Sequence, residues 1–264
     1  MRMHRSPWSV IAVVTLPAVF AVVYQSCVVA QATRHVSWSS SLNLKDTADI
    51  PARLRAPVTE GDQTTPVRLN LTNGTATREI TSCEDYLNAI DAGFYAADNL
   101  MNKKTAAFVG RCYVLRDLQN AHAPVSGHAY SWTKQSLSEL PPLLVAGERS
   151  VADKAEQADR QGKSWQQFDP TLKETAVTPD WLEATDGDYN YSLGILARGS
   201  FEGSGREEIA AYGCAAGQQS TWFECEYFIF APGSDGKLTR LTDSSAPYKL
   251  KIRMPKTESS RSKK

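Results

Sequence analysis

The stretch that decides the fold covers residues 189–230 and reads YNYSLGILARGSFEGSGREEIAAYGCAAGQQSTWFECEYFIF. In its first part, residues 191–198, every second residue belongs to one set, Tyr191, Leu193, Ile195 and Ala197. That period of two is typical of a half-buried strand. Two turns rich in glycine, serine and glutamine follow, and each leads into a further strand-prone segment. We therefore predict three consecutive strands joined by a tight loop and a hairpin turn.

Two cysteines lie on either side of the second turn. In an antiparallel hairpin centred on Gln219 and Ser220, Cys214 is placed directly opposite Cys225. Directly opposed residues are roughly 4.5–5.5 Å apart at Cα, which is within the range that a disulfide accepts. The hairpin register and a disulfide between these two cysteines therefore support each other.

The loop between the first two predicted strands resembles a degenerate FG-GAP or VCBS-type repeat, G-D-F-[ND]-G-D-G-x-x-D-[LIV]. The residues that match are Gly199, Phe201, Gly203, Gly205 and Ile209. The resemblance implies a calcium site, and its ligand positions are Ser200, Glu202, Ser204 and Glu208 in this chain. Hydroxyls stand where two carboxylates are usual, and Ca²⁺ takes roughly six to eight oxygen ligands. Glu202 and Glu208 are therefore the calcium candidates, and the alternative is a glycine-rich turn without an ion.

The N-terminus has the layout of a secretory signal peptide. Basic residues precede an apolar run over residues 8–24, and Ala30-Gln31-Ala32 is an A-x-A cleavage sequence. We therefore expect residues 1–32 to be removed. Two alternatives remain: the run is kept as an uncleaved membrane anchor, or Cys27 is lipidated as in bacterial lipoproteins. All three place the rest of the chain outside the cytoplasm, in the periplasm or secreted.

The cysteine count supports export. Signal removal leaves four cysteines, and an even number in an exported protein predicts two disulfides. A zinc site is disfavoured because no C-x₂-C pair is present. Four cysteines allow three pairings. The expected pairing joins sequence neighbours, Cys83 with Cys112 and Cys214 with Cys225.

The remaining pattern predicts an α+β fold with a helical N-terminal half followed by a small antiparallel sheet. Residues 33–79 have little periodicity and predict an irregular linker with one short strand near 67–71. Residues 80–165 predict helices, of which the first is capped by Thr81 with Glu84, the second by Asp98, and the third covers 150 to about 162. Residues 166–244 predict strands, with a hairpin turn at Asp186-Gly187-Asp188. The tail, 245–264, carries seven Lys or Arg and one Glu and is expected to be disordered.

Over residues 82–230 the layout resembles uncharacterised exported bacterial proteins. The shared features are a first cysteine before a helix, a second cysteine in Cys-Tyr-Val-Leu, a Leu-Pro step and the FG-GAP-like strand pair. Here they are Cys83, Cys112-Tyr113-Val114-Leu115, Leu140-Pro141 and residues 199–209. The resemblance implies an envelope protein without an assigned activity.

Candidate catalytic residues are few. Ser131 and Lys134 match the S-x-x-K motif of acyl-serine enzymes, but the S-x-N and K-T-G partners of that motif are absent downstream. Asp186, Asp188 and Glu202 are candidates for a carboxylate pair that hydrolyses glycans. A four-residue match with two free positions often arises by chance, and the three carboxylates lie in predicted turns, where Asp is common for conformational reasons.

The expected function is that of a non-enzymatic bacterial envelope protein that binds another protein or a cell-wall component. One form would be a periplasmic immunity or inhibitor protein that covers the active site of a toxin. The expected contact surface is aromatic and consists of Trp222, Tyr227 and Phe228. The alternative is a periplasmic hydrolase that uses the candidate serine and lysine or the three carboxylates. We expect no cofactor apart from calcium, no nucleic-acid partner, and membrane contact only through an uncleaved or lipidated N-terminus.

Overall fold

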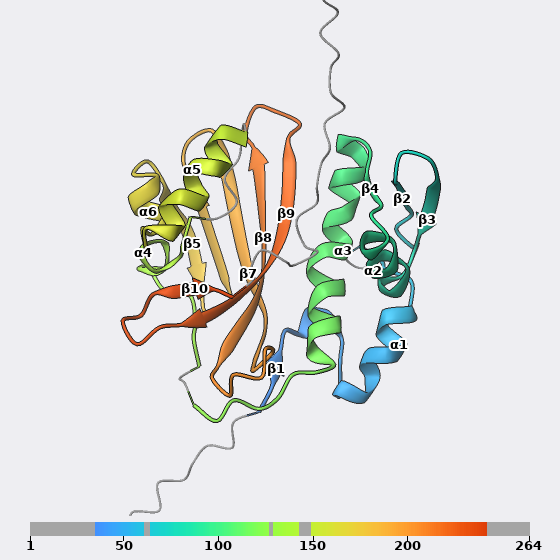
Figure 1. The fold of residues 1–264 in the computed structure, drawn as a ribbon, viewed down its shortest axis with the longest axis horizontal. Coiled ribbons are helices and arrows are strands. Elements are labelled where there is room, and N and C mark those ends of the chain that lie inside the picture. Colours follow the sequence, from blue (N-terminus) through green and yellow to red (C-terminus); the bar gives the residue numbers. More distant parts are fainter. Residues whose placement is uncertain (1–34, 61–63, 127–128, 143–148, 242–264) are drawn as a thin grey trace, which may run out of the picture. The chain divides into compact units, whose positions relative to one another are not determined.

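The computed structural model describes residues 35–60, 64–126, 129–142 and 149–241, which belong to one compact unit, Arg34–Lys264. The predicted signal peptide, Cys27 and the basic tail lie outside the described residues. Figure 1 shows a large twisted sheet with helices on either side of it and a second, smaller sheet beyond one helical layer.

The large sheet is antiparallel throughout and has the strand order β10-β9-β8-β7-β6-β5, with β1 paired to the far end of β7. Strands β5 to β10 are therefore neighbours in the sheet in the order in which they occur along the chain. Their bounds are β1 Ser37–Trp38, β5 Lys173–Thr178, β6 Trp181–Thr185, β7 Tyr189–Gly199, β8 Glu208–Gly217, β9 Phe223–Pro232 and β10 Leu238–Arg240. The small sheet has the order β3-β2-β4, with β2 Leu69–Thr72, β3 Thr77–Ile80 and β4 Tyr95–Ala96.

Helices cover both faces of the large sheet. One layer contains α1 (Ile50–Arg55), α2 (Cys83–Asp91) and α3 (Asn99–Leu118), and α3 packs along β8 and β9. The other contains α4 (Ser136–Glu139), α5 (Arg149–Arg160) and α6 (Trp165–Phe168), which are grouped together in Figure 1. Two 3₁₀ helices, η1 (Ser40–Leu42) and η2 (Thr47–Asp49), precede α1. Within the part of the chain that the structure describes, no helix is long and apolar enough to cross a bilayer.

The large sheet separates two hydrophobic cores, because successive residues of a strand point to opposite faces. Tyr227 and Ile229 of β9 enter the core beneath α3, whereas Phe228 and Phe230 enter the core beneath α4 and α6. All four side chains are buried. Burial of each large apolar side chain contributes roughly 1.5–3 kcal/mol, so β9 stabilises the contacts on both faces.

The second predicted hairpin has the expected register. Cys214 pairs with Cys225 across β8 and β9, and Tyr212 pairs with Tyr227. The disulfide between these cysteines is present, with a Cα–Cα distance of 4.1 Å. The first disulfide joins Cys83, at the start of α2, to the middle of α3. Both predicted pairings are therefore confirmed, and two disulfides indicate an oxidising compartment outside the cytoplasm.

The alternation predicted for β7 does not continue to its end. The pairing with β8 shifts between Ile195 and Ala197, so that Leu196 is an extra residue in the ladder. Such a β-bulge reverses the faces of all residues after it. Ile195 therefore lies in the core beneath α4 and α6, and Ala197 lies in the core beneath α3.

The predicted α+β class is confirmed, but the N-terminal half is not only helical. Residues 33–79, expected to be an irregular linker, contain β1, η1, η2, α1 and most of the small sheet. These elements are short and are held by distant partners: β1 pairs with β7, and a β-bridge joins Pro57 to Ser82. Local patterns are weak where tertiary contacts supply the stability, which explains the missed elements.

The predicted helix starts are correct to within one residue. The N-cap of α2 is Ser82 rather than Thr81, and its Oγ accepts from the backbone N–H of Asp85 at 3.1 Å. Asp98 caps α3 as predicted, and its Oδ1 accepts from the N–H of Met101 at 2.8 Å. Both caps satisfy N–H groups that a helix start otherwise leaves without partners.

Candidate anion-binding site

The loop that resembles an FG-GAP repeat is closed by Glu208, which is 1% exposed. Its Oε2 accepts from the N–H groups of Phe201 at 2.6 Å and Glu202 at 2.9 Å, and its Oε1 accepts from Ser204 Oγ at 2.5 Å. Ser200 Oγ accepts from the N–H of Gly205 at 3.0 Å. The buried carboxylate therefore holds the loop through hydrogen bonds to the loop's own donors. Within residues 35–60, 64–126, 129–142 and 149–241, no three His, Cys, Asp or Glu side chains are grouped so as to hold a metal ion.

The candidate serine and lysine are not brought together by a helix. Ser131 and Lys134 lie in a non-helical segment, and α4 begins only at Ser136. Residues three apart share a face when they are helical. Here that condition is not met, so helical spacing does not place Lys134 on the same face as Ser131.

Glu202 does not form the proposed carboxylate pair with Asp186 or Asp188, because it lies at the opposite end of β7 from both of them. Asp186 precedes this eleven-residue strand and Glu202 follows it. At about 3.3 Å per residue the strand separates them by roughly 30 Å, whereas glycosidase carboxylates are about 5–10 Å apart. Asp186 closes its turn by accepting from the N–H of Tyr189 at 2.8 Å and from the hydroxyl of Tyr191 at 2.6 Å.

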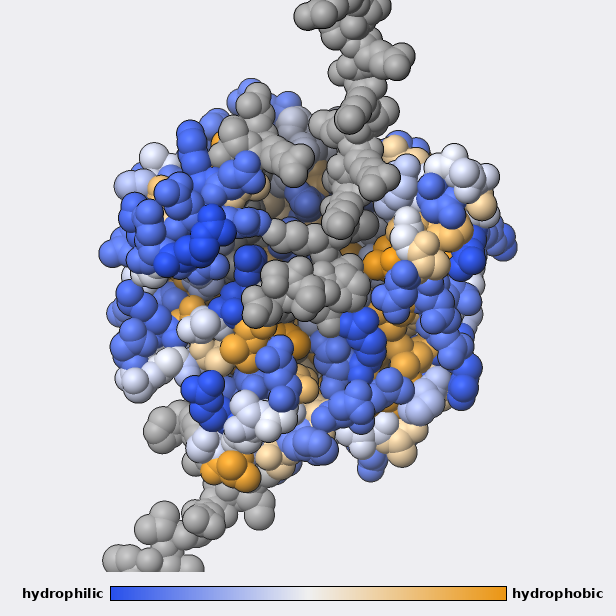
Figure 2. Space-filling model, in the orientation of Figure 1, coloured by the Kyte–Doolittle hydropathy of each residue, from blue (hydrophilic) through white to orange (hydrophobic). Residues whose placement is uncertain are grey.

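The predicted aromatic contact surface is also wrong. Tyr227 and Phe228 are 2% and 1% exposed and lie in the two separate cores. Trp222 is half-buried and packs edge-on against Tyr189, with 5.4 Å between the ring centroids. On the face drawn in Figure 2, hydrophobic residues lie in separate patches between hydrophilic ones.

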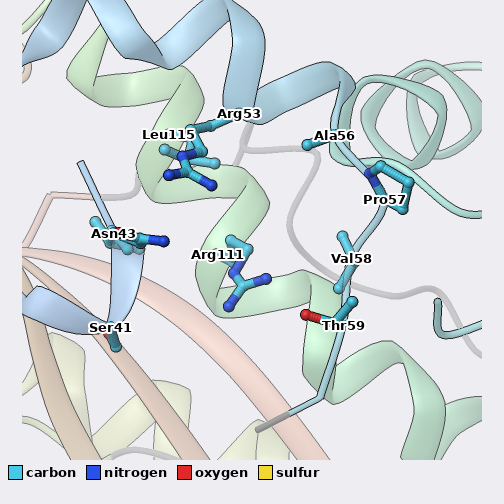
Figure 3. Close-up of a pocket in the computed structure, with 10 residues that line it drawn as sticks. Ser41, Asn43, Arg53, Ala56, Pro57, Val58, Thr59, Arg111 and Leu115 are labelled. Carbon is cyan, nitrogen blue, oxygen red and sulfur yellow. The ribbon is translucent and has the colours of Figure 1, made fainter. Parts of the chain in front are cut away.

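A small cavity between α1 and α3 is a candidate site in the described part of the chain. It has a volume of about 230 Å³ and is lined by Ser41, Leu42, Asn43, Arg53, Ala56, Pro57, Val58, Thr59, Arg111 and Leu115. Figure 3 shows the guanidinium groups of Arg53 and Arg111 and the amide of Asn43 around one space, with the Thr59 hydroxyl directed toward Arg111. We refer to this cavity as the arginine pocket.

The two arginines are positioned by helices whose other faces are buried. In α1, the side chains of Ile50 and Leu54 are buried, which leaves Arg53 on the side that faces the cavity. In α3, Cys112 and Leu115 are buried, and the disulfide to α2 ties Cys112, directly after Arg111, to the start of a second helix. Both guanidinium groups therefore extend from anchored helices.

The opposite walls are held by backbone hydrogen bonds. The N–H of Val58 donates to Thr81 O at 2.7 Å, and Val58 O accepts from the N–H of Val67 at 2.8 Å. Asn43 adopts the left-handed conformation with φ 52° and ends η1 by donating its N–H to Ser40 O. Asn tolerates this conformation better than most residues. The polar side chains of these walls are therefore held near the two guanidinium groups.

The electrostatics of the arginine pocket favour an anion. Burial lowers the pKa of Arg111, and the positive charge of Arg53 lowers it further. Among the described residues, no ion pair includes either arginine. Two like charges without a carboxylate partner, one of them half-buried, create a positive potential that a bound anion would neutralise.

The sequence contained no spacing signal for this site. Arg53 lies in the segment predicted as a linker, and Arg111 is 58 positions further along in the second predicted helix. The one available hint was a charged residue next to a buried cysteine on that helix. Comparison with known proteins gives no match to a family model, a curated protein or a solved structure.

Proposed function

We propose that this chain is a non-enzymatic binding protein of the bacterial envelope, and that the arginine pocket takes up an anionic group of its partner. The observation that carries this proposal is the placement of Arg53 and Arg111 on one cavity without a carboxylate partner among the described residues. A guanidinium group presents several N–H donors in a rigid fork that matches carboxylate and phosphate oxygens.

The energetic balance supports binding rather than a purely structural role. A half-buried charge has lost part of its hydration, and no carboxylate among the described residues forms an ion pair with Arg53 or Arg111 to replace it. Hydrogen bonds to charged groups contribute about 1.5–3 kcal/mol each, so two guanidinium groups supply enough free energy to hold a small anion. A structural ion pair would instead have placed a carboxylate in this cavity.

The size of the cavity indicates what part of a partner it receives. Its volume of about 230 Å³ is below the roughly 300–1,000 Å³ of pockets that enclose drug-sized ligands. The arginine pocket therefore fits one charged group at the end or side of a larger molecule. Proteins and cell-wall polymers both carry such groups, and an immunity or inhibitor protein is one form that this function would take.

Calorimetry with simple anions tests the proposal. The full mature chain with its disulfides intact is titrated at low ionic strength with inorganic phosphate, sulfate and acetate, because screening weakens such contacts at high salt. We expect at least one anion to bind, and Arg111→Gln or Arg53→Gln to weaken that binding at least tenfold. Arg55→Gln is the matched control, since Arg55 is exposed on α1 and does not line the cavity.

Two outcomes would refute this function. One is that no anion binds to the wild-type chain, and the other is that the Arg55 control loses as much affinity as the two pocket variants. Thermal unfolding in the presence of the anions gives a second readout, because a ligand that binds only the folded state raises the melting temperature.

A further inference from the structure

We propose that the arginine pocket selects a phosphomonoester dianion over a carboxylate; this rests on the proposed function and names the chemistry of its ligand. The groups that carry the inference are Arg53, Arg111, Asn43 and Thr59, which reach one cavity from four separate segments of the chain.

The first reason is charge. Two guanidinium groups line the cavity, and none of the ten lining residues is acidic. A carboxylate carries one negative charge and leaves one of the two arginines without compensation. A phosphomonoester carries about −1.5 to −2 charges at pH 7, so that one group compensates both arginines.

The second reason is geometry. Arg53 comes from α1 and Arg111 from α3, while Asn43 and Thr59 belong to two further walls of the cavity (Figure 3). A carboxylate presents two oxygens in one plane. A phosphoryl group presents three strong acceptor oxygens arranged around the phosphorus, which suits donors that approach from several sides.

The third reason is that every polar side chain on the cavity is able to donate a hydrogen bond. The guanidinium groups donate only, the Asn43 amide offers two N–H donors, and the hydroxyls of Ser41 and Thr59 each offer one. A fully ionised phosphoryl oxygen accepts and does not donate. The cavity is therefore matched to a dianion in hydrogen bonding as well as in charge.

The titration of the ligand provides the test, since the arginine pocket has no group that titrates between pH 5 and 7.5. The lining residues contain no His, Asp or Glu. The carboxylates nearest to them in sequence, Glu60, Asp117 and Asp46, are not among the lining residues. A phosphomonoester has a second pKa near 6, so its dianion fraction rises about tenfold between pH 5 and pH 7.5. Sulfate is a dianion over this whole range and serves as the pH-independent reference.

The experiment is calorimetric titration of the full mature chain at pH 5 and pH 7.5 with phenyl phosphate, inorganic phosphate, sulfate and acetate. We expect phenyl phosphate to bind about tenfold more tightly at pH 7.5 than at pH 5, sulfate to bind equally at both, and acetate to bind at least tenfold more weakly than either. Arg111→Lys keeps the positive charge but loses the planar guanidinium group with its paired N–H donors. It should therefore retain more affinity for phenyl phosphate than Arg111→Gln does. Circular dichroism confirms that each variant is folded.

The outcomes separate this inference from the function on which it rests. If acetate binds as tightly as phenyl phosphate, or if the affinity for phenyl phosphate is the same at both pH values, the selection for a dianion is wrong while anion binding stands. If no anion binds, both are wrong. Flotation with phosphatidylcholine vesicles that contain phosphatidic acid distinguishes a lipid source of the group from a soluble one, and either result fits the proposed chemistry.

Discussion

Gly110 lies where α3 packs against Tyr212 of the large sheet, and its replacement by alanine is the sharpest test of the packing. A Cβ atom at this position would lie 2.7 Å from Cδ2, 2.8 Å from Cγ and 3.2 Å from Cβ of Tyr212. Carbon atoms in favourable contact are about 3.5–4.0 Å apart, so the added methyl overlaps the ring by close to 1 Å. Glycine is therefore required here by space.

The ring of Tyr212 has little freedom to move aside. The overlapping atoms are near its backbone, and its hydroxyl lies 3.2 Å from Ala106 O and 3.3 Å from Cys225 Sγ, where it donates to one of the two. The strand β8 that carries it is bonded on both sides, to β7 and β9. The strain must therefore be relieved by a movement of α3.

Two opposing effects determine the magnitude. In the interior of an exposed helix, Gly→Ala stabilises by about 1 kcal/mol through helix propensity. Overpacking of a filled core costs about 1–3 kcal/mol. With an overlap of this size we expect the upper part of that range, so that Gly110→Ala lowers the free energy of unfolding by about 1–2 kcal/mol net.

Urea unfolding followed by far-UV circular dichroism measures the effect. Gly110→Ala should unfold at lower urea than the wild type, and its affinity for sulfate should fall, because Arg111 is the next residue on the helix that moves. In a Tyr212→Ala background the same substitution should become stabilising by up to about 1 kcal/mol, since the overlap is gone. A Gly110→Ala variant as stable as the wild type, or more stable, would refute this account of the packing.

Three further predictions concern buried groups. Glu208→Gln replaces one accepting oxygen by an N–H donor that faces the donors of its loop, so urea unfolding should show that the free energy of unfolding falls by about 2–3 kcal/mol. The same change at the exposed Glu84 is the control and should change the free energy of unfolding by no more than about 0.5 kcal/mol. Replacing both Cys83 and Cys112 by serine opens a loop of 29 residues and should cost about 3–4 kcal/mol, measured against the oxidised wild type; an unchanged urea midpoint would contradict this. Burial, and the charge of Glu226, raise the pKa of Glu224 to about 7 from its ordinary value of 4.5, so its contribution to stability is full below pH 4.5 and is lost as the pH rises through 7. Glu224→Gln should therefore reduce, by about 1–3 kcal/mol, the fall in unfolding free energy between pH 4.5 and pH 8, and a pH profile identical to that of the wild type would exclude this role.

Much of the C-terminal half follows from local pattern. The alternation of residues 191–195, the turn at Asp186-Gly187-Asp188 and the symmetric spacing of Cys214 and Cys225 predicted the strands and the hairpin register that the structure contains. These features can be predicted from sequence because the paired residues of a hairpin are close along the chain. The length of the turn then fixes which residues face each other.

The candidate site could not be predicted in the same way. The sequence favoured Trp222, Tyr227 and Phe228 as a contact surface. A strand with aromatic residues on both faces has the same sequence pattern whether one face of the sheet or both faces are covered by other elements. Here helices cover both faces of the sheet, and the side chains of Tyr227 and Phe228 are buried in the two hydrophobic cores. Burial on the far side of a sheet is decided by segments that are distant along the chain.

The amino-acid sequence by itself predicted strands β5 to β9, the starts of α2, α3 and α5, the pairing of neighbouring cysteines and the α+β class, since each depends on residues that are close along the chain. Only the tertiary structure decided the bulge that reverses the end of β7, the use of Glu208 as an internal anchor, and the meeting of Arg53 with Arg111. The reason is physical: charge pairing and solvent exposure depend on distances between atoms, and two arginines 58 positions apart acquire a shared environment only when α1 packs against α3.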